Sequence, residues 1–319
     1  LQAALLPTPP ARLGPVATSA AYRPADGPAA GGDFYDMFAI EDGRIAVIVG
    51  DVSGHGRQAL PHTALIRFTL RAYLEAGMSP REALRTAGEV LDPQLGGCLA
   101  SVVAATYQPR ERTFVYACAG HPPPMMLGSE PIVPLTACSA PPIGAGMRTG
   151  TRQSVVHAPG WLQVCLHTDG LTDARVAGEL FGAERLESTL AELGPRTTAP
   201  ALLERVVDRT SARPDDMAAC LLRVEGGAGA PRIVTEELEL DREGAASDRA
   251  KRFLLACGVE GRALDGLVRS AREIAESEGA ALIELRLTDG SPQVSVRGDN
   301  VAYLDGARAA RRAGAGASR

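Results

Sequence analysis

The sequence predicts an α/β protein with two domains. Its 319 residues, 45% of them hydrophobic, suffice for one large domain and one small one. Apolar runs of strand length alternate with helical patterns. A break rich in glycine and alanine, residues 226–231, separates the last strand of the larger part from a shorter α/β pattern. We therefore expect a large domain at 11–225 and a small module at 232–303.

The first half of the large domain is expected to contain two strands and then two helices. Alternating apolar positions predict a strand at 16–24, and a continuous apolar run predicts a buried strand at 44–51. A helix at 79–91 opens with Ser79 as its cap and Pro80 in its first turn. Another helix is expected between the strand at 44–51 and this one, with apolar residues on one face at Leu60, Ala64, Phe68 and Ala72.

Strands dominate the second half of the large domain. The segments 99–108 and 113–120 are β-rich and are separated by the short turn sequence PRER, which predicts a hairpin. The elements expected after them are a strand at 161–167, helices at 183–193 and 200–211, and a last strand at 217–224.

The two ends of the chain and the small module have separate patterns. Residues 1–10 resemble the end of a helix stopped by Pro7, and residues 306–319 have too little apolar content to fold, so we expect a disordered tail. The module is expected to contain a strand at 233–240, helices at 247–257 and 262–277, and strands at 281–287 and 293–297.

Composition excludes several classes of function. The net charge of −5, with Lys251 as the single lysine, argues against a general nucleic-acid surface. No apolar run approaches the ~20 residues that span a bilayer, and no secretory leader opens the chain. The six cysteines show no C-x-x-C pair and read as reduced core residues, which predicts a cytoplasmic protein. A chain that opens on Leu1 is expected to be a fragment of a longer one.

The stretch IVGDVSGHG places Asp51 where a strand should end. Glycines after a strand can hold a phosphate with backbone N–H groups, but a carboxylate there repels phosphate unless a cation intervenes. The stretch lacks the GxxxxGK[ST] and GxGxxG patterns of nucleotide loops. An aspartate in this place can also cap the helix that begins near Arg57, so the stretch by itself leaves its function open.

Further acids also lie near the ends of expected strands. Asp33 and Asp36 lie in GGDFYD, and each of the remaining groups also touches the end of an expected strand: Asp169 and Asp173 in TDGLTD, and Asp215 and Asp216 in RPDDM. Carboxylates gathered from distant strand ends repel one another unless hard cations hold them together. Oxygen ligands without a cysteine or histidine pattern favour Mg²⁺ or Mn²⁺. Two such ions ~3.5–4 Å apart can activate a water for attack on phosphorus.

Seven motifs in order resemble the PPM-type metal-dependent serine/threonine phosphatases, in the branch of bacterial regulators similar to RsbU and SpoIIE. They are GGDFYD, GDVSGHG, YACAGHPPP, PPIGAG, HTDGLTDAR, LFGAERL and DDM. The resemblance implies an α-β-β-α sandwich with two Mn²⁺ or Mg²⁺ ions. The resemblance implies that Asp51 bridges both ions and that the Val52 carbonyl binds one of them. It also implies that Asp169 and Asp215 complete the other site and that Asp33 acts on the ions through water.

The resemblance also leaves alternatives open. Asp36 and Asp173 could instead cap a helix or bond the backbone locally, and Asp216 is either a ligand in place of Asp215 or its solvated neighbour. His55 and His121 are interpreted as turn residues in preference to a general acid and a metal ligand. Two departures from the family pattern, Ala218 in place of threonine and Gly88-Glu89 in place of asparagine, fall outside the implied ligands.

The function that the resemblance implies is hydrolysis of a phosphoserine or phosphothreonine on a regulatory protein. The implied substrate is an anti-sigma factor antagonist with a STAS domain in a bacterial partner-switching pathway, controlled by an upstream sensor domain. The apolar stripe of Leu1, Leu5 and Leu6 predicts an upstream helix that pairs with a second copy, which would make a homodimer. The alternatives are a non-catalytic signalling scaffold and a two-metal enzyme acting on nucleotides.

The small module resembles the first half of the histidine-kinase-type ATPase fold found in anti-sigma factor kinases. The order of its elements fits, but the family's metal-binding and adenine-binding motifs do not. The alignment places Ser270 and Ile274 at the positions of the catalytic glutamate and the metal-binding asparagine, and Gly298-Asp299-Asn300 at the adenine loop. An apolar isoleucine cannot bind an ion, so we expect a regulatory or docking module that does not bind ATP.

Overall fold

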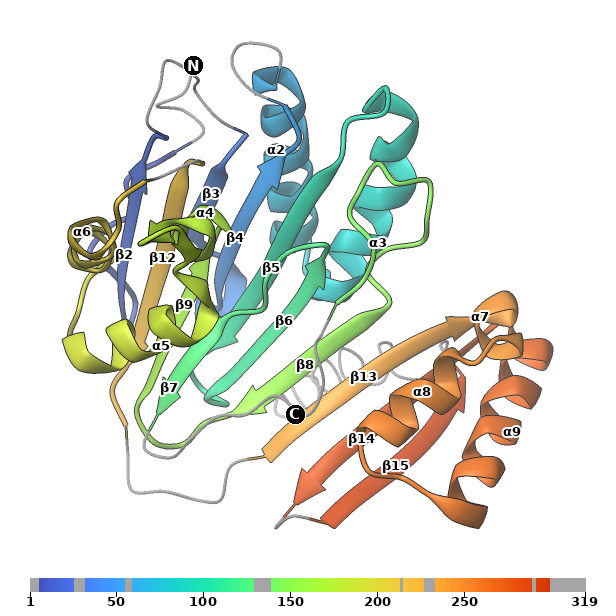
Figure 1. Ribbon diagram of the computed structural model, residues 1–319. Helices are drawn as coiled ribbons and strands as arrows, with labels where there is room; N and C mark the ends of the chain where they lie inside the picture. Colours follow the sequence, from blue (N-terminus) through green and yellow to red (C-terminus); the bar gives the residue numbers. More distant parts are fainter. Residues whose placement is uncertain are drawn as a thin grey trace, which may run out of the picture. The chain divides into compact units, whose positions relative to one another are not determined.

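The computed structural model describes residues 6–25, 32–54, 59–128, 139–212, 215–226, 233–288 and 291–298. The chain divides into two compact units, Leu1–Arg232 and Ile233–Arg319. The first unit is a four-layer sandwich, in which helices cover the outer faces of two stacked sheets (Figure 1). This confirms the α-β-β-α arrangement that the family resemblance implied.

One sheet of the first unit has the strand order β1-β2-β12-β9-β7, and each neighbouring pair is antiparallel. The expected strands at 16–24, 161–167 and 217–224 are confirmed as its three central strands. The bounds are β1 (Arg12–Leu13), β2 (Val16–Arg23), β12 (Met217–Val224), β9 (Leu162–His167) and β7 (Met125–Gly128).

The other sheet has the order β8-β6-β5-β4-β3 within this unit, again antiparallel. The expected hairpin is confirmed as β5 and β6, and the expected buried strand as β4. Strands β3 and β8 are additional to those expected. The bounds are β8 (Arg152–His157), β6 (Thr113–Ala119), β5 (Ala100–Gln108), β4 (Ile45–Val52) and β3 (Phe34–Ala39).

The side chains of β3 show how the layers divide. Successive residues of a strand point to opposite faces of its sheet. Tyr35 and Met37 are accordingly buried in the apolar core between the two sheets, whereas Phe34 and Phe38 are buried in a second core beneath the helices of their own sheet. A third core lies between the first sheet and its helices. The sandwich therefore has a separate apolar core at each interface between layers.

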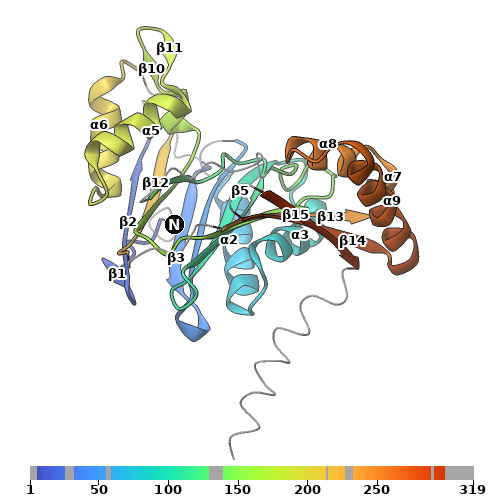
Figure 2. The same ribbon diagram turned by 90° about the horizontal axis from the view of Figure 1, so that it is seen from below.

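Helices α2 (Leu60–Glu75) and α3 (Pro80–Leu91) cover one side of the sandwich, and α5 (Gly182–Leu193) and α6 (Ala199–Arg209) cover the other (Figure 2). Each expected helix of the large domain is thus confirmed. The shorter elements are η1 (Glu41–Gly43), η3 (Asp92–Gln94), α4 (Gly170–Asp173) and the hairpin of β10 (Arg175–Val176) with β11 (Glu179–Leu180).

The start of α3 is fixed by a capping box. The Ser79 hydroxyl accepts from the Glu82 backbone N–H at 3.3 Å, and the Glu82 carboxylate accepts from the Ser79 backbone N–H at 2.9 Å. Near its end, α3 carries Gly88 against Thr149, where a Cβ would lie 2.7 Å from the threonine Cγ2. This close approach is a physical reason for glycine at a position where the family often has asparagine.

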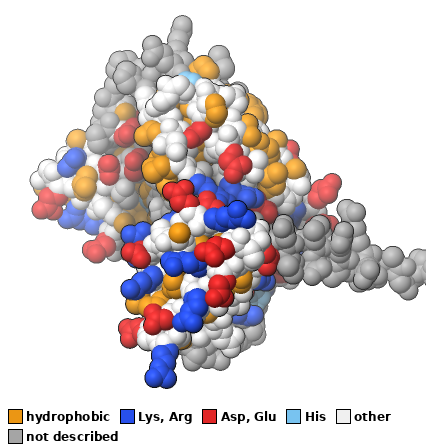
Figure 3. All heavy atoms as spheres, turned by 90° about the vertical axis from the view of Figure 1, so that its right-hand side faces the viewer, with side chains coloured by type: hydrophobic (Ala, Val, Ile, Leu, Met, Phe, Trp, Pro, Cys, Tyr) orange, Lys and Arg blue, Asp and Glu red, His pale blue; other side chains and the backbone are white. Residues whose placement is uncertain are grey.

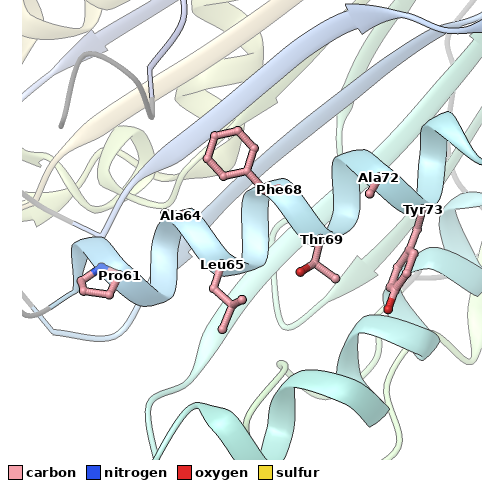
Figure 4. Close-up of a pocket in the computed structure, with 7 residues that line it drawn as sticks. All are labelled: Pro61, Ala64, Leu65, Phe68, Thr69, Ala72 and Tyr73. Atoms are coloured by element: carbon pink, nitrogen blue, oxygen red, sulfur yellow. The ribbon is translucent and has the colours of Figure 1, made fainter.

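Helix α2 packs against the sheet with a different face from the one its apolar spacing marks. Its buried residues include Ile66, Leu70 and Leu74, whereas Phe68 is 53% exposed. The marked face instead lines a shallow surface hollow of about 600 Å³ along the helix (Figure 4). The helix therefore has two apolar faces, and the sequence spacing indicates the outward one.

A buried ion pair connects α2 to the sheet. The Asp36 carboxylate in β3 lies 2.7 Å from the guanidinium of Arg67 and 3.2 Å from that of Arg71. The side chains of Asp36 and Arg67 are only 2% and 5% exposed. The structure thus gives Asp36 a role different from the two alternatives left open for it, because its carboxylate pairs with two arginines of the covering helix.

The second unit contains an antiparallel sheet of β13, β14 and β15, and its helices lie on one face of that sheet (Figure 1). The expected order of elements is confirmed, with an additional short helix, α7, capped by Asp241. The bounds are β13 (Ile233–Asp241), α7 (Arg242–Ala246), α8 (Arg249–Ala256), α9 (Gly261–Glu278), β14 (Ala280–Thr288) and β15 (Ser291–Gly298).

Two observations concern the surface. Among the described residues, no helix is both long and apolar enough to cross a membrane. On the face shown in Figure 3, basic and acidic side chains are interspersed and do not gather by sign. The expected regulatory helix at LQAALLP and the disordered tail at 306–319 lie almost wholly outside the described residues.

We predict that replacing Asp36 with alanine destabilises the first unit strongly. The substitution leaves the buried Arg67 guanidinium without its nearest carboxylate, and breaking a buried ion pair by removing one partner costs about 3–5 kcal/mol. Urea denaturation followed by circular dichroism measures this. Asp208→Ala, at an exposed site on α6, is the control and should leave the unfolding midpoint unchanged. Equal midpoints for the two variants would refute the structural role of the pair.

Candidate functional site

Acids from both sheets meet at one end of the sandwich. Asp33 directly precedes β3 and Asp51 lies near the end of β4, and these strands are antiparallel neighbours in which Phe34 pairs with Gly50. Asp169 follows the end of β9, and Asp215 and Asp216 precede β12; here Ala219 pairs with His167. The register of each strand pair therefore brings its acids together.

Two glycines allow the loops that carry these acids to touch. A Cβ on Gly32 would overlap the Val52 carbonyl oxygen and the Asp51 carboxylate, and the Val52 N–H donates to the Gly32 carbonyl at 3.2 Å. A Cβ on Gly170 would overlap the backbone carbonyl of Asp216. Any side chain at either glycine would push two acid-bearing loops apart.

The acids are close enough to perturb one another. Burial, and next the negative charge of Asp51, raise the pKa of Asp33 well above its usual value. Burial, followed by the charges of Asp169 and Asp215, raises the pKa of Asp51 from 3.8 to about 7. Burial, followed by the charges of Asp173 and Asp215, raises the pKa of Asp169. The acids therefore form one electrostatic cluster that favours bound positive charge.

Thr168 holds Asp33 in this cluster. Its hydroxyl donates to Asp33 Oδ2 at 2.8 Å and accepts from the Ala218 backbone N–H at 2.9 Å. The Thr168 N–H donates to the Ala218 carbonyl at 3.0 Å. Ala218 contributes its backbone to this network and its methyl group to the core between the sheets, so a small side chain suffices there. Thr168 lies within the motif HTDGLTDAR, but nothing in the sequence of that motif indicates its contact with Asp33.

Asp215 and Asp216 have different surroundings. The Asp216 carboxylate is buried and accepts from the Tyr22 hydroxyl and the Ala25 N–H, each at 2.7 Å. Asp215 is exposed, and its Oδ1 accepts from the Asp216 N–H at 2.8 Å. Asp216 is therefore not a solvated neighbour. Its carboxylate fixes the loop to β2, which leaves Asp215 as the more accessible oxygen ligand.

His121 connects the two sheets behind the cluster. It is buried, its Nε2 donates to the His167 carbonyl at 3.0 Å, and its Nδ1 accepts from the Ser101 hydroxyl at 2.8 Å. Ser101 is the ladder partner of Asp51. Burial lowers the pKa of His121 to about 3, so the ring stays neutral. These contacts fit its interpretation as a turn residue, whereas His55 lies outside the described residues.

The donor set fits a hard cation. Asp51, Asp169, Asp215 and the Val52 carbonyl offer oxygen only, and a cation would take the place of the protons that burial and repulsion favour on Asp51 and Asp169. Within the described ranges, no group of three Asp, Glu, His or Cys side chains is already arranged as a metal-ligand set. The cluster thus offers the oxygen ligands that a hard cation prefers. Its side chains would have to move closer together to bind the ion.

Comparisons with known proteins show what the chain is similar to. Residues 41–225 match the family model of stage II sporulation protein E (SpoIIE). The Synechocystis protein IcfG is 29% identical over 189 residues, which cover 50% of this chain but 30% of that protein. The chain thus corresponds to less than a third of its curated relative.

Two solved structures share the fold. The RsbU and RsbW domains of Rv1364c from Mycobacterium tuberculosis match with a TM-score of 0.55 and 22% identity, covering 88% of this chain and 83% of that one. The PP2C phosphatase domain of SpoIIE from Bacillus subtilis matches with a TM-score of 0.56 and 18% identity, covering 66% and 63%. The match to the RsbU and RsbW domains covers 88% of the chain, which is more than the first unit contains. The similarity therefore extends into the second unit.

We predict that the metal-free protein loses stability as pH rises. Because the pKa of Asp51 is raised from 3.8 to about 7, the folded state keeps a proton that the unfolded chain releases across this window. Asp51→Asn should therefore raise the unfolding free energy at pH 8 in a chelator, by ~2–4 kcal/mol, and change little at pH 4. Melting curves across pH measure this, with Asp208→Asn as the exposed control. Parallel profiles for wild type and Asp51→Asn would contradict the coupling.

Proposed function

This chain belongs to the SpoIIE family, and on that premise we propose that its first unit hydrolyses a phosphoserine or phosphothreonine on a regulatory protein with the help of Mn²⁺ or Mg²⁺. The observation that carries the proposal is the cluster of Asp33, Asp51, Asp169 and Asp215. These acids come from four different segments of the chain, and burial together with the nearby negative charges raises the pKa of Asp33, Asp51 and Asp169. Such an arrangement is unfavourable unless it binds cations.

Each residue then has a separate task. Two hard cations would polarise a water and the phosphoryl oxygens. The charges of both Asp169 and Asp215 act on Asp51, so we propose Asp51 as the ligand that would be shared, and the Val52 carbonyl would supply a neutral oxygen beside it. Asp33, fixed by the Thr168 hydroxyl, orients water from the buried side. We propose Asp215 as the ligand in preference to Asp216.

The cysteines argue against a thiol mechanism. Burial raises the pKa of Cys165 to about 12 and that of Cys220 well above its usual value, so neither forms a thiolate at neutral pH. Cys118 is buried as well. These three cysteines thus serve as small core residues, and direct attack by water agrees better with this site than a covalent phosphocysteine.

The proposed substrate is a phosphorylated anti-sigma factor antagonist with a STAS domain, within a partner-switching pathway. The combination of two units supports a regulatory setting, because the likeness to a structure that holds RsbU and RsbW domains covers both. A scaffold without activity and a nucleotide-directed enzyme are the alternatives, and the assays below separate them.

For the second unit we propose a regulatory or docking role without ATP binding. Ser270 and Ile274 both lie on α9 and are partly buried, and an isoleucine provides no ligand for the magnesium of a nucleotide. The residues aligned with the adenine loop, Asp299 and Asn300, lie outside the described part of the chain.

We predict that phosphatase activity requires added Mn²⁺ or Mg²⁺, since ligand sets made of oxygen bind these ions modestly. Asp51→Asn and Asp169→Asn should each lower kcat by at least ~1,000-fold while the proteins stay folded. The assays compare p-nitrophenyl phosphate, a phosphoserine protein and cyclic nucleotides, with Asp208→Asn as the control. Full activity after exhaustive chelation would refute the metal mechanism. Hydrolysis of cyclic nucleotides alone would favour the second alternative, and inactivity toward all substrates would favour the scaffold.

We predict that the whole chain shows no heat of binding when ATP and Mg²⁺ are titrated into it. Apolar Ile274 stands where the kinase-like fold needs an oxygen ligand for the metal. Isothermal titration calorimetry measures this, with a competent anti-sigma factor kinase as the positive control. A dissociation constant in the micromolar range would show that the second unit is a functional kinase-like module.

A further inference from the structure

A pocket of about 480 Å³ lies in the first unit next to the acid cluster. Residues 122–126, which lead into β7, form one wall, and the opposite wall comes from α4 and the start of α5. In Figure 1 the labels β7, α4 and α5 mark this side of the sandwich. Its lining includes one buried histidine and two exposed acids, a combination that the proposed hydrolysis does not use.

The buried histidine is His167, which is 2% exposed. Its Nδ1 lies 3.0 Å from the Thr168 carbonyl, which can only accept, so Nδ1 carries the proton and Nε2 is an acceptor. Nε2 is buried without a hydrogen-bond partner, although the residue lines the pocket. A buried acceptor left unpaired is unfavourable, and a donor from a ligand would satisfy it.

Among the described residues that line this pocket, the charged side chains are acidic. Asp173 in α4 and Glu187 in α5 are exposed and belong to the lining. Much of the remaining lining is apolar and includes Met125, Met126 and Leu180. A ligand that suits the pocket therefore carries positive charge, several hydrogen-bond donors and an apolar stem.

We propose that this pocket binds an arginine side chain of the phosphorylated protein substrate. A guanidinium carries a positive charge and five N–H donors, which match the acidic side chains and the unpaired Nε2 of His167, and its methylene stem matches the apolar part of the lining. An acidic or phosphorylated side chain would be repelled by the same two acids. The inference rests on the proposed function, because it names what the phosphatase recognises beside the phosphate.

The pocket adjoins the reaction centre through α4. Asp173 ends the short helix that Asp169 begins, and its N–H donates to the Asp169 carbonyl at 2.7 Å. His167 and Asp169 are separated by Thr168 alone. An arginine bound in the pocket thus lies a few residues along the substrate chain from the phosphoserine.

Binding can be tested independently of turnover. The chain has six methionines, of which Met125 and Met126 line the pocket, so ¹³C-methyl methionine spectra of the whole chain report on it. Capped arginine should shift these two resonances, and capped citrulline, its uncharged analogue, should not. Met37 in the core between the sheets and exposed Met147 are internal references.

Glu187→Arg should abolish these shifts, whereas Glu184→Arg, on the same helix but not in the lining, should preserve them. Absence of shifts at Met125 and Met126, equal shifts with citrulline, or shifts that survive in Glu187→Arg would each overturn the proposal.

Turnover of an arginine scan in phosphoserine peptides tests the link to catalysis. At one position relative to the phosphoserine, arginine should raise kcat/KM about tenfold over alanine in wild type and in Glu184→Arg, but not in Glu187→Arg. Turnover of p-nitrophenyl phosphate should be equal in all three. A flat scan with active enzyme would overturn the recognition role and leave the phosphatase proposal standing. Loss of all turnover would refute the phosphatase proposal, while the methyl shifts still decide on the pocket.

Discussion

Repulsion among carboxylates is the constraint on which the structure of the first unit depends. The fold brings Asp33, Asp51, Asp169 and Asp215 together at the ends of two sheets, although burial and mutual charge raise the pKa of three of them. Close backbone contacts at Gly32 and Gly170 hold the loops in place against this repulsion. The sandwich thus holds these carboxylates together at one end, where their mutual repulsion favours binding of a hard cation.

Two other buried acids of the unit have partners within the protein, and this contrast helps to identify the site. Asp36 is as deeply buried as any of the clustered acids, yet two arginines of α2 neutralise it. Asp216 is also buried and is held by the Tyr22 hydroxyl and a backbone N–H. Three acids that lie in the family motifs, Asp36, Asp215 and Asp216, therefore differ in role. Asp36 stabilises a layer, Asp216 fixes a loop, and Asp215 keeps an accessible carboxylate.

The sequence predicted the architecture well where periodicity and capping are strong. The box at Ser79, the hairpin of β5 and β6, and the order of elements in the second unit all follow from local patterns. Strand β3 is buried on both faces, with Phe34, Tyr35 and Met37 all in apolar cores, so its sequence lacks the alternation of apolar and polar residues that would indicate a strand. The buried face of α2 was misjudged because the helix is apolar on two sides. Contacts between distant segments, such as Thr168 with Asp33, leave no periodic signal in the chain.

The most direct test of the central claim is to locate the ions. Anomalous diffraction from crystals of the chain grown with Mn²⁺ should show two peaks, one on each side of the Asp51 carboxylate, with Asp169 and Asp215 bound to one of them. Asp36 should remain paired with Arg67 in the same crystals. The absence of manganese at Asp51, or peaks at acids outside the cluster alone, would contradict the account.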